Sequence, residues 1–182
     1  MATKTKWEID QAHTEIAFKV KHLMIVNVKG VFTEYGASIY TTGTDFLTTE
    51  IDFWMNPNSL GTNDEKRDAH LRSADFFDVA HHKEITFRSN SIGKVTDEKY
   101  ELWGDLTIKG ITKKIKLDVE FGGVIKDPWG GERAGFTIIG KINRKDWELN
   151  WNTVLEGGGV LVGDTVTIAC EAELIKEVQV QA

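Results

Sequence analysis

The chain has 182 residues, of which 41% are hydrophobic and 27% charged, an ordinary globular balance with enough apolar material for a core. With 22 basic and 28 acidic residues its net charge is -6, which argues against nucleic acid or an anionic membrane surface as an electrostatic partner. No apolar run approaches the roughly 20 residues needed to cross a bilayer, so we predict no integral membrane segment.

The amino end, from Met1 to Asp10, lacks the apolar stretch of a secretory signal. We therefore expect a cytoplasmic chain, or a periplasmic one if an export signal has been removed from it.

Alternating apolar and polar residues predict about eight strands. The first run is 15–22, where Ile16, Phe18, Val20 and His22 share one face because successive strand side chains point to opposite sides. The further predicted strands are 28–40, 49–56, 84–92, 99–109, 113–125, 134–143 and 164–176. Short polar or glycine-bearing turns join most of them, which is typical of an antiparallel barrel or sandwich.

Glycines interrupt the second run at Gly30 and Gly36, and we interpret them as bulges or bends. Residues 59–83 have no two-residue period. Here Asn63 is the expected N-cap of a short helix that runs through Leu71, followed by a tight turn over residues 74–78.

The hairpin from Gly104 to Phe121 shows the alternation most clearly. Its inward face is apolar and its outward face is charged, so the sheet must hide one face by packing or by closing on itself. Gly104, Gly140 and Ala172 occupy inward positions where a filled barrel would have large side chains. Such glycines either bend the sheet or leave room for something that is not protein.

Two aromatic residues, Trp54 and Trp103, share the phase of charged neighbours. We predict that they form a contact surface, since exposed aromatics on a charged face commonly mark interfaces. The only cysteine, Cys170, lies in the apolar phase of its strand, so we expect an inert buried thiol.

No sequence motif indicates nucleotide binding or nucleophilic catalysis. Residues 157–159 are three glycines between strands, which we interpret as a flexible loop. Neighbouring His81 and His82 point apart in an extended chain. His13 and His22 are expected on one strand, where their odd spacing puts them on opposite faces unless a bulge intervenes. His70, among charged helix residues, suggests a network that anchors the helix. We predict neither a functional metal nor a cofactor.

Several blocks, in one order over nearly the whole chain, resemble the YceI-like family of lipid- or polyisoprenoid-binding proteins. The matching blocks are Trp7 to His22, Lys29-Gly-Val-Phe32, Arg67 to Asp78, Ile85 to Ser89, Gly104 to Phe121, Ile142 to Trp147 and Val162 to Val166. The resemblance implies a lipocalin-like barrel with a hydrophobic channel, closed at one end, that holds a long isoprenoid or related amphiphile. It also implies a carrier or storage role and, because dimers are common in the family, the formation of a homodimer.

We therefore predict one all-β domain over residues 1–176 and a frayed tail over 177–182. The domain is expected to be an extended antiparallel eight-stranded lipocalin-like β-barrel with a short helix between strands. Its function would be to bind a long-chain isoprenoid or similar amphiphilic lipid in the lumen, without catalysis. The predicted ligand-contacting residues are Phe18, Val20, His22, Phe32, Phe53, Phe87, Leu102, Leu106, Ile108, Leu117, Val119, Phe136, Ile138, Ile142, Val166 and Ile168.

Within this set, His22 lies near a strand end and is either a partner for a polar head group or a hydrogen-bonded core histidine. Two other functions remain open. One is a hydrolase or isomerase that uses His70 with Asp68 or Asp75. The other is a structural or stress-response protein with a filled barrel that associates through Trp54 and Trp103.

Overall fold

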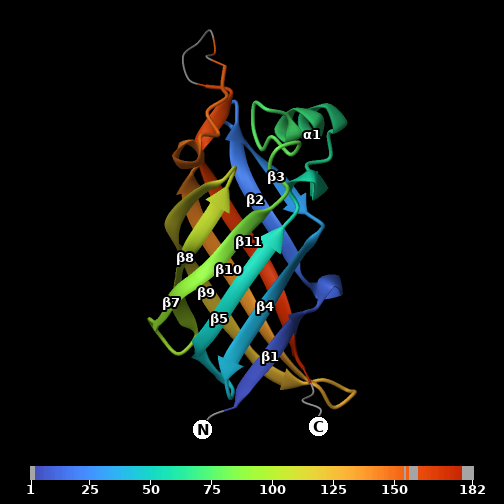
Figure 1. Ribbon diagram of the computed structural model, residues 1–182, viewed down its shortest axis with the longest axis vertical. Coiled ribbons are helices and arrows are strands. Elements are labelled where there is room, and N and C mark those ends of the chain that lie inside the picture. The colour runs from blue at the N-terminus through green and yellow to red at the C-terminus, as the bar shows by residue number, and fades with distance from the viewer. Residues whose placement is uncertain (1–2, 154, 156–159, 178–182) are drawn as a thin grey trace.

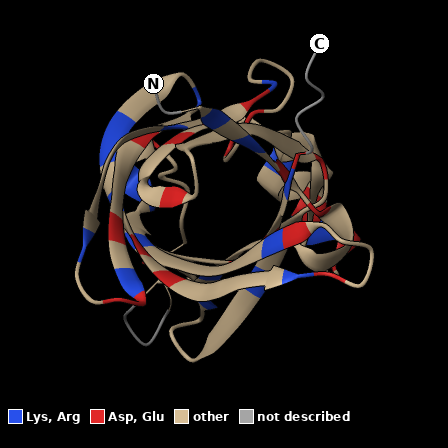
Figure 2. Cartoon of the chain, turned by 90° about the horizontal axis from the view of Figure 1, so that it is seen from below, with Lys and Arg blue, Asp and Glu red and all other residues tan. Residues whose placement is uncertain are grey.

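In a computed structural model, which describes residues 3–153, 155 and 160–177, the strands form a tall closed barrel (Figure 1). The described residues contain eleven strands joined in one sheet. They are β1 (Lys4–Ile9), β2 (Glu15–His22), β3 (Val26–Phe32), β4 (Tyr35–Thr42), β5 (Asp45–Met55), β6 (Leu60–Gly61), β7 (Ile85–Lys94), β8 (Lys99–Ile108), β9 (Ile111–Lys126), β10 (Glu132–Asn143) and β11 (Val162–Lys176). Seen along its axis, the ring of strands contains basic and acidic residues in many places around the barrel (Figure 2).

Eight strand paths close the barrel within the described part of the chain. Antiparallel pairing runs in the order β1-β4-β5-β7-β8-β9-β10-β11, and β11 pairs with β1 to complete the ring. Toward the other end, β2 continues the path of β1 along β11, and β3 continues the path of β4 along β2. The predicted eight-stranded antiparallel barrel is confirmed.

The first strand path begins earlier than predicted. Residues 4–9, which were assigned to no strand, form β1, and its Trp7 is completely buried. A short 3-10 helix, η1 (Gln11–His13), separates β1 from β2 because the Asp10 side chain accepts a hydrogen bond from the Ala12 backbone N–H. His13 lies in η1 and His22 ends β2, so the prediction that they share one strand was wrong.

The inward glycines Gly104 and Gly140 let neighbouring side chains approach the wall. A Cβ at Gly104 would lie 2.3 Å from the Phe87 ring, and one at Gly140 would lie 2.5 Å from the Leu117 side chain. The register of β7 on β8 also shifts opposite Gly104, within Ser89–Ser91. The space above both glycines is thus occupied by protein, and bending was the better interpretation at Gly104.

Gly30 and Gly36 were interpreted as bulges or bends within one run over 28–40, and this was wrong, because the run divides at Thr33 and Glu34, between β3 and β4. A Cβ at Gly30 would lie 2.3 Å from the Phe18 ring, and one at Gly36 would lie 2.7 Å from Nε1 of Trp54. Strand register runs through both positions without a shift. These glycines accommodate an aromatic ring from the adjacent strand, a recognised use of glycine in sheets.

The predicted short helix is present as α1 (Glu65–Arg72), between β6 and β7. Its N-cap is Asp64 rather than Asn63, because the Asp64 carboxylate accepts hydrogen bonds from the backbone N–H groups of residues 66 and 67 at 3.0 and 3.1 Å. Asn63 stands one residue earlier in a left-handed conformation, with φ of 63°. None of the described helices is long and apolar enough to cross a membrane.

Two arginines fix α1 to the end of the barrel. The Arg67 guanidinium donates to the carbonyl oxygen of Thr62 at 2.6 Å and to its hydroxyl at 2.8 Å. Arg72 donates to the carbonyl oxygens of Leu60 at 2.6 Å and Asn58 at 3.1 Å. Polar anchoring to β6 and the segment around it therefore positions this helix, which lies near the top of Figure 1.

Two predictions fall largely outside the described residues. They are the flexible glycine loop at 157–159 and the frayed tail at 177–182, of which Glu177 alone is described.

Candidate ligand-binding cavity

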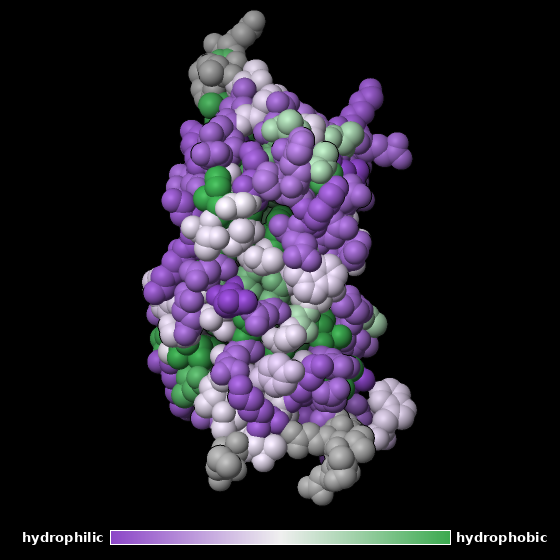
Figure 3. Space-filling model, viewed as in Figure 1, coloured by the Kyte–Doolittle hydropathy of each residue, from purple (hydrophilic) through white to green (hydrophobic). Residues whose placement is uncertain are grey.

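The barrel encloses a cavity of about 550 Å³ lined almost entirely by apolar side chains. This volume lies within the roughly 300–1,000 Å³ of small-molecule sites. The outer side seen in Figure 3 is instead mainly hydrophilic. All the predicted ligand-contacting residues line the cavity: Phe18, Val20, His22, Phe32, Phe53, Phe87, Leu102, Leu106, Ile108, Leu117, Val119, Phe136, Ile138, Ile142, Val166 and Ile168. Their contact with a ligand stays a prediction.

Four aromatic side chains, which we call the aromatic plug, fill the lumen near the chain termini. They are Trp7, Phe46, Phe121 and Phe136. The Phe46 ring centre lies 5.1 to 5.2 Å from those of the other three, a separation at which aromatic pairs attract. Trp7 is 0% exposed and Phe46 is 8% exposed, so the plug seals this end from solvent.

Trp7 is held in the plug by a polar contact as well. Its Nε1 donates to the Thr41 hydroxyl at 3.0 Å, and that hydroxyl donates onward to the carbonyl oxygen of Gly43 at 2.7 Å. A buried indole N–H needs such a partner, because an unpaired one would lose its hydrogen bond to water. The plug is therefore both packed and hydrogen-bonded.

At the opposite end, polar side chains join the lining, and we call this set the mouth. The mouth consists of Lys21, His22, Thr62, Lys66, Arg67, His70 and Arg144. No carboxylate is among the described residues that line the cavity. The open end therefore presents positive charge and hydrogen-bond donors to whatever the apolar lumen holds.

Arg144 fixes the wall on the far side of the mouth. It belongs to the 3-10 helix η3 (Arg144–Trp147) and is only 3% exposed. Its guanidinium donates to the carbonyl oxygens of Leu149, Trp151 and Gly163, the last at 2.9 Å. Burial lowers the pKa of Arg144, and the facing carbonyls and Asp164, 3.9 Å away, compensate its charge.

The mouth also contains a paired histidine. Nε2 of His70 lies 2.8 Å from Oδ2 of Asp75, whereas Asp68 accepts hydrogen bonds from Thr62. Of the two predicted partners, Asp75 is thus the one that contacts His70. The ring of Trp151 meets the imidazole edge-on, 4.5 Å between centres. This is a histidine oriented by a carboxylate, which is an arrangement used in general base catalysis.

A second charged cluster, which sequence reasoning missed, lies on the outside near the plug. Oxygen and nitrogen atoms of Asp10, His13 and Glu173 come within 4.8 Å of one another, close enough to hold a metal ion. However, Arg133 already donates to Asp10 at 2.7 Å and to Glu173 at 2.9 Å. Its charge opposes a cation there, so we interpret the cluster as an ion-pair network that joins η1, β10 and β11.

The adjacent histidines do not point apart as predicted. His81 lies 2.9 Å from Asp78, and His82 lies 4.0 Å from the same carboxylate. The prediction assumed extended chain, but residues 79–81 form a turn, and Asp78 before it has a φ of 47°. The hydrogen bond from His81 is the main cause of the lowered pKa of Asp78.

Cys170 is buried at the inner wall, and burial raises its pKa to about 11. Because the thiolate is the reactive form, this thiol is inert near neutral pH. Trp54 and Trp103 lie on the outer face with 37% of each exposed. The Lys114 ammonium stands 5.5 Å from the Trp103 ring centre. That these tryptophans form a contact surface stays a prediction.

Sequence reasoning identified His22 at the mouth and Phe136 in the plug but missed several other residues at the two ends of the cavity. Phe46 precedes the strand predicted over 49–56, and Trp7 lay in no predicted strand. At the mouth, Phe76, Phe77 and Trp151 line the cavity from irregular segments. Two signals were available: the paired aromatics at 76–77 after a short helix, and the alternation of Thr5, Trp7 and Ile9.

Comparison with known proteins agrees with this architecture. The sequence profile of the YceI-like domain matches residues 7–174. A UPF0312 protein of Staphylococcus aureus (strain N315) is 41% identical over 93% of this chain and 96% of its own. The structure of a YCEI protein from Campylobacter jejuni is 35% identical, with a TM-score of 0.75 over 93% of this chain and 96% of that one. A polyisoprenoid binding domain from Saccharophagus degradans has the same fold at 16% identity, with a TM-score of 0.62 over 95% and 98% of the two chains.

Proposed function

This chain belongs to the YceI-like family, and from that premise we propose that it is a non-enzymatic carrier of a long-chain isoprenoid or similar amphiphile. The observation that supports the proposal best is the apolar cavity of about 550 Å³, sealed by the aromatic plug and open at the mouth. The polyisoprenoid binding described for the Saccharophagus degradans domain is consistent with it.

Hydrophobic burial alone is sufficient for tight binding of such a ligand. Each methylene group removed from water contributes about 0.8 kcal/mol, so a prenyl or alkyl tail needs no ionic contact along the lumen. The tail would extend toward the plug. The head group would lie at the mouth, where Lys66 and Arg67 offer positive charge and His22 offers a ring nitrogen for hydrogen bonding.

The direct test is native mass spectrometry of the protein purified from its own host. We expect a bound species of defined mass that is released on denaturation and extracts into organic solvent. A chain that is always recovered without any bound lipid would contradict the proposal.

A matched pair of variants on β11 makes the test specific to the lumen. Val166 faces the cavity, and Thr165 beside it is exposed on the outside. Val166→Trp is expected to fill the lumen, keep the fold and reduce lipid retention at least tenfold, because the tail loses several methylene contacts. Thr165→Trp should retain lipid like the wild type. Equal retention by both variants would place the ligand elsewhere.

The contact between His70 and Asp75 favours a second candidate, a hydrolase or isomerase acting at the mouth. It would be supported if His70→Ala abolished turnover of a bound ester or isoprenoid while leaving lipid retention unchanged. The filled-barrel alternative required a packed interior, and the cavity does not agree with it.

A further inference from the structure

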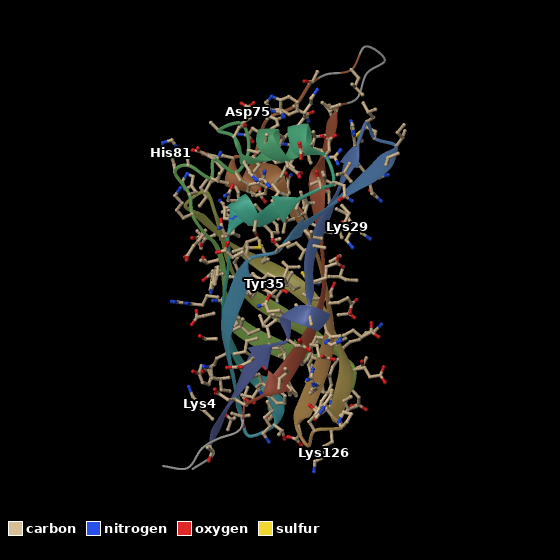
Figure 4. All side chains as sticks on the ribbon, turned by 90° about the vertical axis from the view of Figure 1, so that its right-hand side faces the viewer. Lys4, Lys29, Tyr35, Asp75, His81 and Lys126 are labelled. Carbon is tan, nitrogen blue, oxygen red and sulfur yellow. The ribbon has the colours of Figure 1, made fainter. Side chains whose placement is uncertain are left out.

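The hairpin between β2 and β3 ends in four exposed apolar residues, which we call the apolar tip. They are Leu23, Met24, Ile25 and Val26, with exposed fractions of 41%, 49%, 78% and 57%. The hairpin lies at the same end of the barrel as α1 and projects to the side in Figure 4. A soluble protein gains nothing from exposing four consecutive apolar side chains, and such patches commonly mark binding surfaces.

The backbone of the apolar tip is strained in a way that a simple turn would avoid. Leu23 and Met24 have φ of 54° and 62°, and the Ile25 backbone N–H donates to the carbonyl oxygen of His22 at 3.2 Å. Asn and Gly are preferred where two successive turn residues have positive φ, because large L-residues are disfavoured there. The turn between β8 and β9 also has two successive residues with positive φ, but the second of them is a glycine, Gly110. Backbone strain that persists under large apolar side chains points to a functional use of them.

The apolar tip is continuous with the wall of the cavity. Leu23 donates its backbone N–H to the carbonyl oxygen of Leu161 at 2.8 Å, and His22 pairs with Val162 across the strands. His22, Leu161 and Val162 all line the cavity. An apolar tail could therefore pass from the surroundings of the tip into the lumen along one apolar surface.

Two exposed lysines of the mouth complement this apolar surface. Lys21 precedes the tip on β2, and Lys66 lies on α1. Within the described ranges, neither has an ion-pair partner. An apolar wedge with basic residues around it matches the interface of a phospholipid bilayer, where apolar side chains enter the acyl boundary and ammonium groups meet phosphates.

We propose that the mouth end docks on the surface of a phospholipid bilayer, with the apolar tip inserted among the lipids, and that cargo enters and leaves there. This inference rests on the proposed carrier function, because a polyisoprenoid or similar amphiphile resides in membranes. The net charge of -6 disfavours long-range attraction to anionic lipid. Docking is therefore driven by insertion and should depend little on salt.

The opposite end of the barrel supplies an internal control. The hairpin between β9 and β10 also exposes apolar residues, with Ile125 at 65% and Trp129 at 83%. That hairpin lies beyond the aromatic plug and does not contribute to the cavity lining. If exposure alone sufficed for membrane contact, both hairpins would bind vesicles. If continuity with the cavity matters, the β2–β3 hairpin alone does.

The test is co-sedimentation of the full chain with phosphatidylcholine vesicles. The variant Leu23→Asn with Met24→Gly removes apolar surface and relaxes the turn, so it should fold at least as well as the wild type. We expect its vesicle affinity to fall about tenfold or more. Ile25→Ser should weaken binding in the same direction, and Ile125→Ser should bind like the wild type. Docking is overturned if the wild type does not sediment with vesicles, or if Ile125→Ser weakens binding as much as the tip variants.

Failure of docking and failure of the carrier function give different results. Leu23→Asn with Met24→Gly does not alter the cavity lining, so lipid already bound should be retained while its exchange with vesicles slows. A wild type that holds lipid in native mass spectrometry but ignores vesicles overturns docking alone. If the lumen is empty and the vesicles are bound, the carrier function fails instead.

Discussion

The two ends of this barrel use the same alternating strands for opposite purposes. At the plugged end, Trp7 and Phe46 come from different strands and meet across the lumen, where little of either side chain remains exposed. At the mouth, α1 and η3 replace them, and polar groups enter the lining. The strand pattern therefore fixes a tube, and the few residues that cross it decide whether an end is closed or open.

The plugged end should carry more of the stability, and Trp7→Ala is its strongest test. Loss of the completely buried indole and of its bond to Thr41 should lower the free energy of unfolding by about 4 kcal/mol. Trp129→Ala removes the same type of side chain from an exposed position and should change the free energy of unfolding by less than about 0.5 kcal/mol. Urea unfolding measures both, and similar losses would mean that the plug is not a stability centre.

At the mouth, the corresponding test is Arg144→Met, which should lower the free energy of unfolding by a smaller amount, about 2 to 3 kcal/mol. The variant leaves the carbonyl oxygens of Leu149, Trp151 and Gly163 without their donor, although water from the mouth can replace part of it. Lys145→Met, at an exposed neighbour, is the control and should be close to neutral. Faster hydrogen exchange confined to residues 149–153 and 160–163 would locate the effect at the mouth. Uniformly faster exchange would contradict a local role.

The pH dependence of stability should arise mainly near the plugged end. The hydrogen bond with His13 is the main cause that lowers the pKa of Asp10 to about 2, and the hydrogen bond with Arg133 lowers the pKa of Asp127. A carboxyl group whose pKa is lowered by folding stabilises the fold above its unfolded value near 3.8. That contribution is lost as pH falls through the folded value. Stability should therefore decline between about pH 4 and pH 2.

The same network predicts a weaker effect of opposite sign near neutral pH. Asp10 raises the pKa of His13 above 6.5, so the imidazolium stabilises the fold at low pH and this contribution disappears as pH rises through the raised value. Thermal unfolding across pH should show that Asp10→Asn flattens the acid decline and that His13→Gln removes the loss that begins as pH rises above 6.5. An unchanged profile in both variants would exclude the network as its source.

The strands and the inward wall could be predicted because alternation is a local property. Each strand displays its own inward phase, so Phe18, Leu106 and Ile168 could be assigned without knowing their neighbours. The assembly of four aromatic residues into the plug could not be predicted, since it depends on which distant strands pair and at what register. Phe46 contacts Phe121 and Phe136 only because β4, β5, β9 and β10 bring them to one level of the ring.

The mouth was hard to predict for a different reason. Arg144 is a buried arginine, against the usual distribution of charged residues, and it is satisfied by backbone carbonyls that leave no mark in the sequence. The N-cap was misplaced by one residue because Asn63 and Asp64 are both good caps by residue type. Which of them is used depends on the path of the preceding chain.

The inward glycines allow the width of the cavity to be changed by substitution. The Phe87 ring lies close to Gly104 and the Leu117 side chain lies close to Gly140, so the width of the cavity at each of these levels depends on both members of the pair. Exchanging large and small partners within such a pair would widen or narrow the channel while the backbone register stayed the same. Selection for slimmer or bulkier cargo could thus act on a few side chains without rebuilding the sheet.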